Sequence, residues 1–165
     1  MITAHHTPYA LQFITPGGTS RGVLTEKETH FITLCKGDGW GIGECAVFRG
    51  LSRDDRPNYV EILKWACDNI HLGLETLSET LVDWPTIVFG LEMAFHSLEA
   101  PNSMELYPST FLEGEGIPIN GLIWMGNIPE MEARITERLE QGYDCLKLKI
   151  GALDFERELT LLKAL

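Results

Sequence analysis

The last third of the chain alternates between apolar runs and amphipathic stretches, and this alternation constrains the fold most. Residues 117–124 and 144–150 are mainly apolar, and residues 129–141 and 154–165 have the spacing of helices. Strand, helix, strand and helix joined by short connections predict two parallel βα units. Apolar runs of this kind are typical of strands buried on both faces of a parallel sheet.

Two βα units cannot close a barrel, and they leave the edge of a parallel strand open. The final predicted helix also ends at residues 158–165 in the middle of its period, without the glycine or proline that usually follows a helix. We therefore expect the chain to be truncated, as the N-terminal part of a longer α/β protein.

The preceding residues predict an α+β domain. Strands are expected over 2–14, 29–36 and 40–47, with a tight turn at Gly37-Asp38-Gly39 and a polar loop over 15–21, and together they predict a three-stranded antiparallel meander. Helical spacing follows, with Ser52 as the expected N-cap of the first helix. The three expected helices cover residues 53–70, 76–82 and 85–98.

Composition and charge exclude several classes of function. A hydrophobic content of 44% and a charged content of 22% exclude a disordered or fibrous chain. The formal charge of −11 argues against a nucleic-acid or anionic-membrane partner, because both require a basic surface. An anionic small molecule is compatible with this charge if a few cations or a metal converge at one place.

The expected location is the cytoplasm. No apolar window approaches the roughly 18 residues of a membrane span, and the first ten residues lack the pattern of a secretory signal. The four cysteines lie far apart without a CxxC pair, so we expect reduced, buried thiols rather than a disulfide or a zinc site.

The strongest chemical signal is the Lys-x-Lys pair in the second apolar run. Side chains alternate along a strand, so Lys147 and Lys149 share one face and the leucines beside Lys147 share the other. If the leucine face packs on helices, both lysines point to the opposite side, which is the interior of a barrel. Burial and mutual repulsion would then lower a lysine pKa toward neutrality, as a general base requires. The alternative is an edge strand with both lysines in solvent.

Two loops contain candidate substrate-binding residues. In the loop over 15–21, glycines give backbone freedom, hydroxyls can donate, and Arg21 can bind a carboxylate through two hydrogen bonds. This loop is either a flap over a ligand or an ordinary exposed loop. The second loop, around Arg49 and Leu51, is locally basic in an acidic chain. The candidate residues are Gly18, Thr19, Ser20, Arg21, Arg49 and Leu51.

Other polar residues predict no site. His5 and His6 are adjacent on a strand and face opposite ways, which makes them poor joint metal ligands. His96 lies beside an apolar stripe and is expected to be structural. The sequence contains no GxGxxG, Walker or GxSxG motif, and we expect no metal site in this chain.

The order and spacing of these features resemble the enolase superfamily over essentially all 165 residues. The segment Trp40 to Cys45 is similar to that family's G-x-G-E strand, and Ala46 to Ser52 to its substrate-facing loop. Residues 119–124 resemble the first barrel strand and 146–151 the second, which carries Lys-x-Lys. The resemblance implies a capping domain over 1–115 and the start of a TIM-type barrel over 116–165.

Within the superfamily, residues 120–125 are most similar to the o-succinylbenzoate synthase family of menaquinone biosynthesis. This resemblance implies a Mg²⁺-assisted loss of water through an enediolate, from a small carboxylate substrate. Lys149 is implied as the general base and later the acid, with Lys147 as its electrostatic neighbour. The loop from Gly17 to Arg21 is implied to cap the substrate.

The family's three acidic metal ligands and its second lysine lie on later barrel strands that this sequence does not contain. We therefore expect Mg²⁺ for the full-length enzyme but no turnover by this chain alone. Two alternatives stay open. The first is a sibling enzyme: a dipeptide epimerase, an N-succinylamino acid racemase or a muconate cycloisomerase. The second is a non-catalytic capping module that binds or oligomerises, and the sequence leaves a homo-oligomer open.

Overall fold

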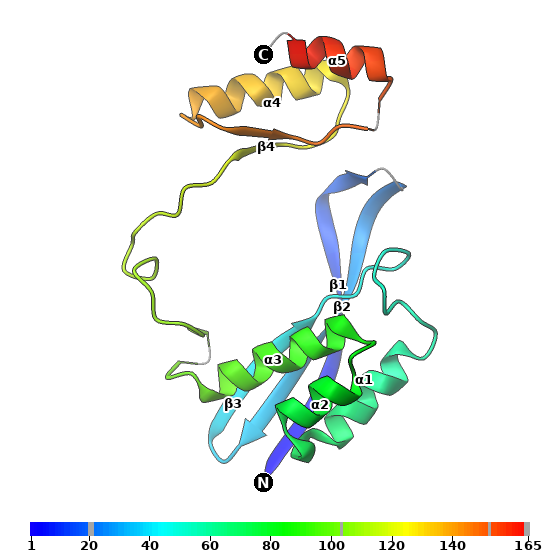
Figure 1. Ribbon diagram of the computed structural model, residues 1–165, viewed down its shortest axis with the longest axis vertical. Helices are drawn as coiled ribbons and strands as arrows, with labels where there is room; N and C mark the ends of the chain where they lie inside the picture. Colours follow the sequence, from blue (N-terminus) through cyan, green and yellow to red (C-terminus); the bar gives the residue numbers. More distant parts are fainter. Residues whose placement is uncertain (20–21, 103, 152, 164–165) are drawn as a thin grey trace. The chain divides into compact units, whose positions relative to one another are not determined.

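The computed structural model describes residues 1–19, 22–102, 104–151 and 153–163. The chain forms two compact units. The first contains Met1–Gln12 and Glu26–Ser109, and the second contains Phe13–Thr25 and Thr110–Leu165. An antiparallel sheet with helices is followed by two parallel βα units, which confirms the predicted fold class (Figure 1).

The sheet has the order β1 (Ile2–Thr19), β2 (Gly22–Lys36) and β3 (Gly39–Cys45). β2 and β3 pair antiparallel, from His30 opposite Cys45 to Lys36 opposite Gly39. The chain reverses at Gly37, whose φ of 60° lies in the left-handed region that glycine adopts without strain. The predicted meander and its turn are confirmed.

The expected loop over 15–21 is wrong in its first part. β1 continues as a strand through Pro16 to Thr19, and β2 already begins at Gly22, well before the expected start at residue 29. β1 lies at the edge of the sheet, where a proline removes no hydrogen bond that an inner strand would need. Pairing with β2 therefore continues past the Pro-Gly-Gly sequence that predicted a loop.

The helices of the first unit follow β3. They are α1 (Tyr59–Asp68), the short 3-10 helix η1 (Ile70–Leu72), α2 (Leu74–Thr80) and α3 (Pro85–Glu99). α3 lies along β3, and its first residue is the proline that predicted its start (Figure 1).

The expected N-cap of the first helix is wrong. α1 begins at Tyr59, and residues 49–58 contain turns but no helix. Pro57 disfavours a helical conformation at the residue before it, which delays the helix. The Ser52 hydroxyl instead accepts a hydrogen bond of 2.8 Å from the Phe48 amide within the preceding loop.

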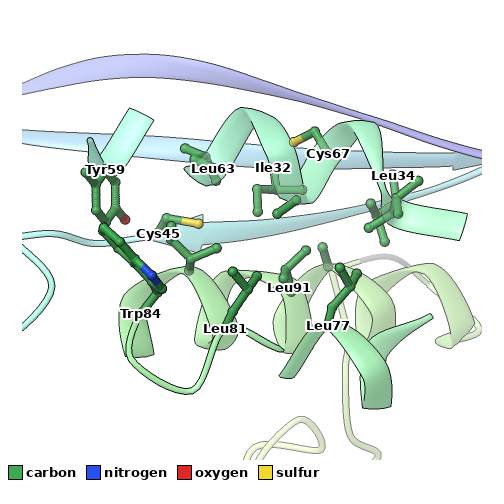
Figure 2. Packing of buried hydrophobic residues seen from close by; sticks show 14 of the residues in the cluster. Ile32, Leu34, Cys45, Tyr59, Leu63, Cys67, Leu77, Leu81, Trp84 and Leu91 are labelled. Atoms are coloured by element: carbon green, nitrogen blue, oxygen red, sulfur yellow. The ribbon is translucent and has the colours of Figure 1, made fainter. Parts of the chain in front are cut away.

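The core of the first unit lies between β2 and β3 on one side and the helices on the other. Ile32, Leu34 and Cys45 are fully buried, and Figure 2 shows them among side chains from the helices. Leu63 of α1 and Leu91 of α3 are also fully buried in this cluster. Burial of this apolar surface stabilises the unit, at roughly 25 cal/mol per Å² removed from water.

The second unit contains β4 (Gly121–Ile123), α4 (Ile128–Glu140), β5 (Leu146–Leu148) and α5 (Phe155–Lys163). β4 and β5 are parallel neighbours, so the two predicted βα units are confirmed, with strands shorter than expected. Asn127 and Glu130 form a reciprocal capping box at the start of α4. Ile123, Met131 and Leu161 belong to a second hydrophobic core.

The four cysteines are free thiols, but only two of them are buried. Cys45 and Cys67 lie in the first core, where burial raises the pKa of both thiols, that of Cys67 to about 11. Cys35 is half-buried and Cys145 is exposed, so the expectation of buried thiols is wrong for these two.

Among the described helices, none is both long enough and apolar enough to cross a membrane.

Candidate active site

The Lys-x-Lys segment lies where β5 joins the second core. Leu146 and Leu148 pack against the core cluster that α4 and α5 supply, which confirms the predicted leucine face. Lys147 lies opposite Leu122 in the strand register, and both side chains are exposed. The two residues therefore mark the face of the β4–β5 pair that α4 and α5 do not cover.

Lys149 lies just beyond the C-terminal end of β5. Its amide donates a 3.1 Å hydrogen bond to the Ile123 carbonyl, which extends the pairing with β4 by one residue. Its Nζ atom lies 3.7 Å from the centroid of the Trp124 ring, within the range of a cation–π contact. Lys149 is half-buried, so it is neither a fully solvated edge lysine nor a fully buried base.

Arg134 of α4 supports the end of β4. One guanidinium nitrogen of Arg134 donates to the Trp124 carbonyl at 2.9 Å and to the Met125 carbonyl at 3.2 Å. The backbone that presents the Trp124 ring is therefore fixed by the helix that follows it. Sequence reasoning missed this residue, because its partners lie nine and ten positions earlier in the chain.

Glu158 of α5 supports the turn after Lys149. The residue is buried, and its carboxylate accepts hydrogen bonds from the Gly151 amide at 2.8 Å and the Leu153 amide at 3.2 Å. Buried carboxylates are stable where backbone donors replace the lost water. Sequence reasoning missed this residue too. Its burial could have been detected, because Glu158 lies three positions before the core residue Leu161 and therefore on the same face of the helix.

The candidate capping loop falls partly outside the described residues. Ser20 and Arg21 lie outside them, and Gly18 and Thr19 form the end of β1. Beside that end, the second unit contains a pocket of about 500 Å³. Gly17, Leu122 and Trp124 are among the residues that line it.

The second candidate loop is built around Arg49. Its guanidinium pairs with Glu28 and with Asp55, each at 2.8 Å. These two carboxylates raise the pKa of Arg49, Glu28 contributing most, and the Arg49 hydrogen bond lowers the pKa of Glu28. Arg49 therefore stabilises its own loop, whereas Leu51 is 45% exposed and projects from it.

A further polar cluster surrounds Glu44, the acidic residue of the G-x-G-E segment. Lys27 and Thr29 both bond its Oε1 atom, at 2.9 Å and 2.8 Å. The Lys27 hydrogen bond lowers the pKa of Glu44 below its ordinary value, against the opposing effect of burial. Sequence reasoning did not identify these partners, which lie on the neighbouring strand.

Within the part of the chain that the structure describes, no three His, Cys, Asp or Glu side chains are placed to hold a metal ion. His5 and His6 do alternate, one exposed and one half-buried, as the strand pattern predicts. His96 contacts the Tyr107 ring, with centroids 5.9 Å apart.

Comparisons with known proteins identify the family and the fold of the chain. No family model matches the chain. An o-succinylbenzoate synthase from Desulfotalea psychrophila is 34% identical over an alignment 184 positions long, which covers 92% of this chain and 50% of that protein. The crystal structure of MenC from Desulfotalea psychrophila matches with 28% identity and a TM-score of 0.65, over 98% of this chain and 52% of that one.

A dipeptide epimerase from Cytophaga hutchinsonii, solved with Mg and a dipeptide, shares the fold at 20% identity. Its TM-score is 0.68, over 99% of this chain and 48% of that one. The fold and the sequence similarity show that the chain belongs to the enolase superfamily. Within that superfamily, it is homologous to the N-terminal half of o-succinylbenzoate synthase and spans about half the length of the curated relative it matches.

Proposed function

We propose that this chain is the N-terminal portion of an o-succinylbenzoate synthase of menaquinone biosynthesis, acting in the cytoplasm. The observation that carries the proposal is the 34% identity to an o-succinylbenzoate synthase across 92% of the chain. The Lys147–Lys149 segment on the helix-free face of the β4–β5 pair supports it, because a barrel directs that face to its interior. We also propose that residues 1–115 form the capping domain and that residues 116–165 begin the barrel domain.

Lys149 is the proposed general base. Its neutral amine takes the proton from the carbon next to the carboxylate of a succinylated hydroxycyclohexadiene. The resulting ammonium then gives that proton to the departing hydroxide, which leaves as water while the ring becomes aromatic. Both transfers use one nitrogen, so the proton and the hydroxyl leave from the same face of the substrate.

Lys147 is the proposed electrostatic neighbour of Lys149. It stands two residues earlier on the same face of the strand, where its charge attracts the substrate carboxylate. Leu51 and the segment from Gly18 to Arg21 are the proposed substrate contacts. The pocket lined by Gly17 and Trp124 supports a substrate-binding role for the segment that follows Gly17. The proposed role of Arg49 is to hold the loop that carries Leu51, through its ion pairs with Glu28 and Asp55.

Mg²⁺ belongs to the proposal for the full-length enzyme, since a relative of the same fold was solved with Mg. The described residues of this chain do not form a suitable ligand set. The steps above therefore use only the chain's own lysines, and the proposed metal ligands lie on the later barrel strands of the full-length enzyme.

The test is a dehydration assay on a full-length protein that carries this sequence. We expect ultraviolet absorbance to report formation of the aromatic product, and Lys149→Ala to abolish it. Lys163→Ala is the control, because that exposed lysine ends α5 away from the β5 strand. Epimerisation of a dipeptide without dehydration would replace the proposal with the sibling enzyme, and binding without turnover would replace it with a non-catalytic capping module.

A further inference from the structure

Trp124 and Lys149 are in contact, although they belong to separate segments of the sequence. They follow the last paired residues of β4 and β5, Ile123 and Leu148, and so occupy adjacent positions at the same end of the two strands. The ammonium nitrogen of Lys149 lies 3.7 Å from the ring centroid of Trp124. A lysine side chain is a flexible four-carbon stem. The cation–π contact favours the conformations in which the ammonium lies over the indole.

Each member of the pair is supported by the helix that follows its strand. Arg134 of α4 holds the Trp124 carbonyl, and Glu158 of α5 holds the turn at Gly151, two residues after Lys149. Both supports are charge-assisted hydrogen bonds, which are stronger than neutral ones. The two side chains therefore face each other on backbones that are fixed independently.

We propose that Trp124 is a positioning residue for the Lys149 amine, with Arg134 and Glu158 fixing the two backbones. The inference rests on the proposed function of Lys149 as the base. A general base must lie within hydrogen-bond reach of the proton that it removes, and small misplacements cost a large part of the rate. The indole provides the flat surface against which the lysine is held before the substrate arrives.

The contact itself can be tested on the present chain. Its six lysines are converted to ¹³C-dimethyl-lysines, which keep their positive charge, and their NMR signals are recorded. We expect the Lys149 signal, identified by its loss in Lys149→Arg, to be displaced upfield by the indole ring current. Trp124→Leu should abolish the displacement, and Trp124→Phe should keep part of it. Trp65→Leu, which removes an indole from α1, should leave it unchanged.

The catalytic consequence is tested in a full-length protein that carries the same changes. Trp124→Leu should lower kcat by on the order of 10- to 100-fold with little change in KM, and Trp124→Phe should restore most of the rate. A Lys149 signal that Trp124→Leu does not move, or an unchanged kcat, would overturn the positioning role. A displaced signal in a wild-type protein without dehydratase activity would instead overturn the proposed function, and leave the contact established.

Discussion

Gly43 of β3 and Gly90 of α3 bring the strand and helix backbones into direct contact. A Cβ atom added at Gly43 would overlap the Gly90 carbonyl oxygen and lie 2.8 Å from the Ala94 amide nitrogen. A Cβ atom at Gly90 would in turn overlap the Cys45 sulfur. The second glycine of the G-x-G-E segment therefore has a packing function, because only a residue without a side chain allows α3 to approach β3 so closely.

Gly43→Ala is expected to destabilise the first unit by about 1–3 kcal/mol or more, since the overlapping atoms belong to backbone that cannot move aside. Gly116→Ala is the matched control, because nothing lies within 4 Å of its added Cβ atom. Urea unfolding monitored by tryptophan fluorescence measures both changes. Equal midpoints for Gly43→Ala and the wild type would contradict the packing argument.

Asp54→Ala is expected to cost about 1–3 kcal/mol of unfolding free energy, because it removes the acceptor of two part-buried hydrogen bonds. The Asp54 side chain is fully buried, and one of its oxygens accepts from the Thr86 amide at 2.8 Å and from the Thr86 hydroxyl at 2.7 Å, at the start of α3. Asp83→Ala is the control, since it removes an exposed ion pair with Arg53 worth about 0–1 kcal/mol. Similar losses of unfolding free energy in both variants would show that the hydrogen bonds from Thr86 to Asp54 do not stabilise the start of α3.

The stability of the first unit is expected to fall as the pH drops below 6.5. Burial lowers the pKa of His6 from its ordinary value of 6.5, and the nearby His30 and Lys64 lower it further, against a small opposing effect of Asp68. The unfolded chain therefore takes up this proton first. The stabilisation is complete above pH 6.5 and is lost as the pH falls through the lowered value.

His6→Phe tests this pH dependence, because it removes the titrating group from the half-buried face of β1. We expect a smaller difference in unfolding free energy between pH 7.5 and pH 5.5 than in the wild type. His5→Phe, on the exposed face, should keep the wild-type difference. An undiminished difference in His6→Phe would assign the effect to other groups.

The elements that local pattern determines could be predicted from the sequence. The βα units followed from apolar runs separated by helical spacing, and the start of α3 from Pro85. The face of β5 occupied by Leu146 and Leu148 followed from alternation alone. In each case the signal lies within a few neighbouring residues.

Features set by distant partners could not be predicted. The strand continues to Thr19 because β2 pairs with it, which no local signal beside Pro16 reveals. Arg49 appeared available for a substrate because its partner Glu28 lies 21 residues earlier, on strand β2. Glu158 showed no function until the turn at Gly151 was seen to donate to it.

In the proposed mechanism, Lys149 removes the proton next to the substrate carboxylate. The most direct measurement follows exchange of that proton with deuterium by NMR, in a full-length protein that carries this sequence. Lys149→Ala is expected to abolish the exchange, by a factor on the order of 100 or more, while Mg²⁺ binding measured by calorimetry is unchanged. Exchange at a near-normal rate in Lys149→Ala would show that a group other than Lys149 removes the proton.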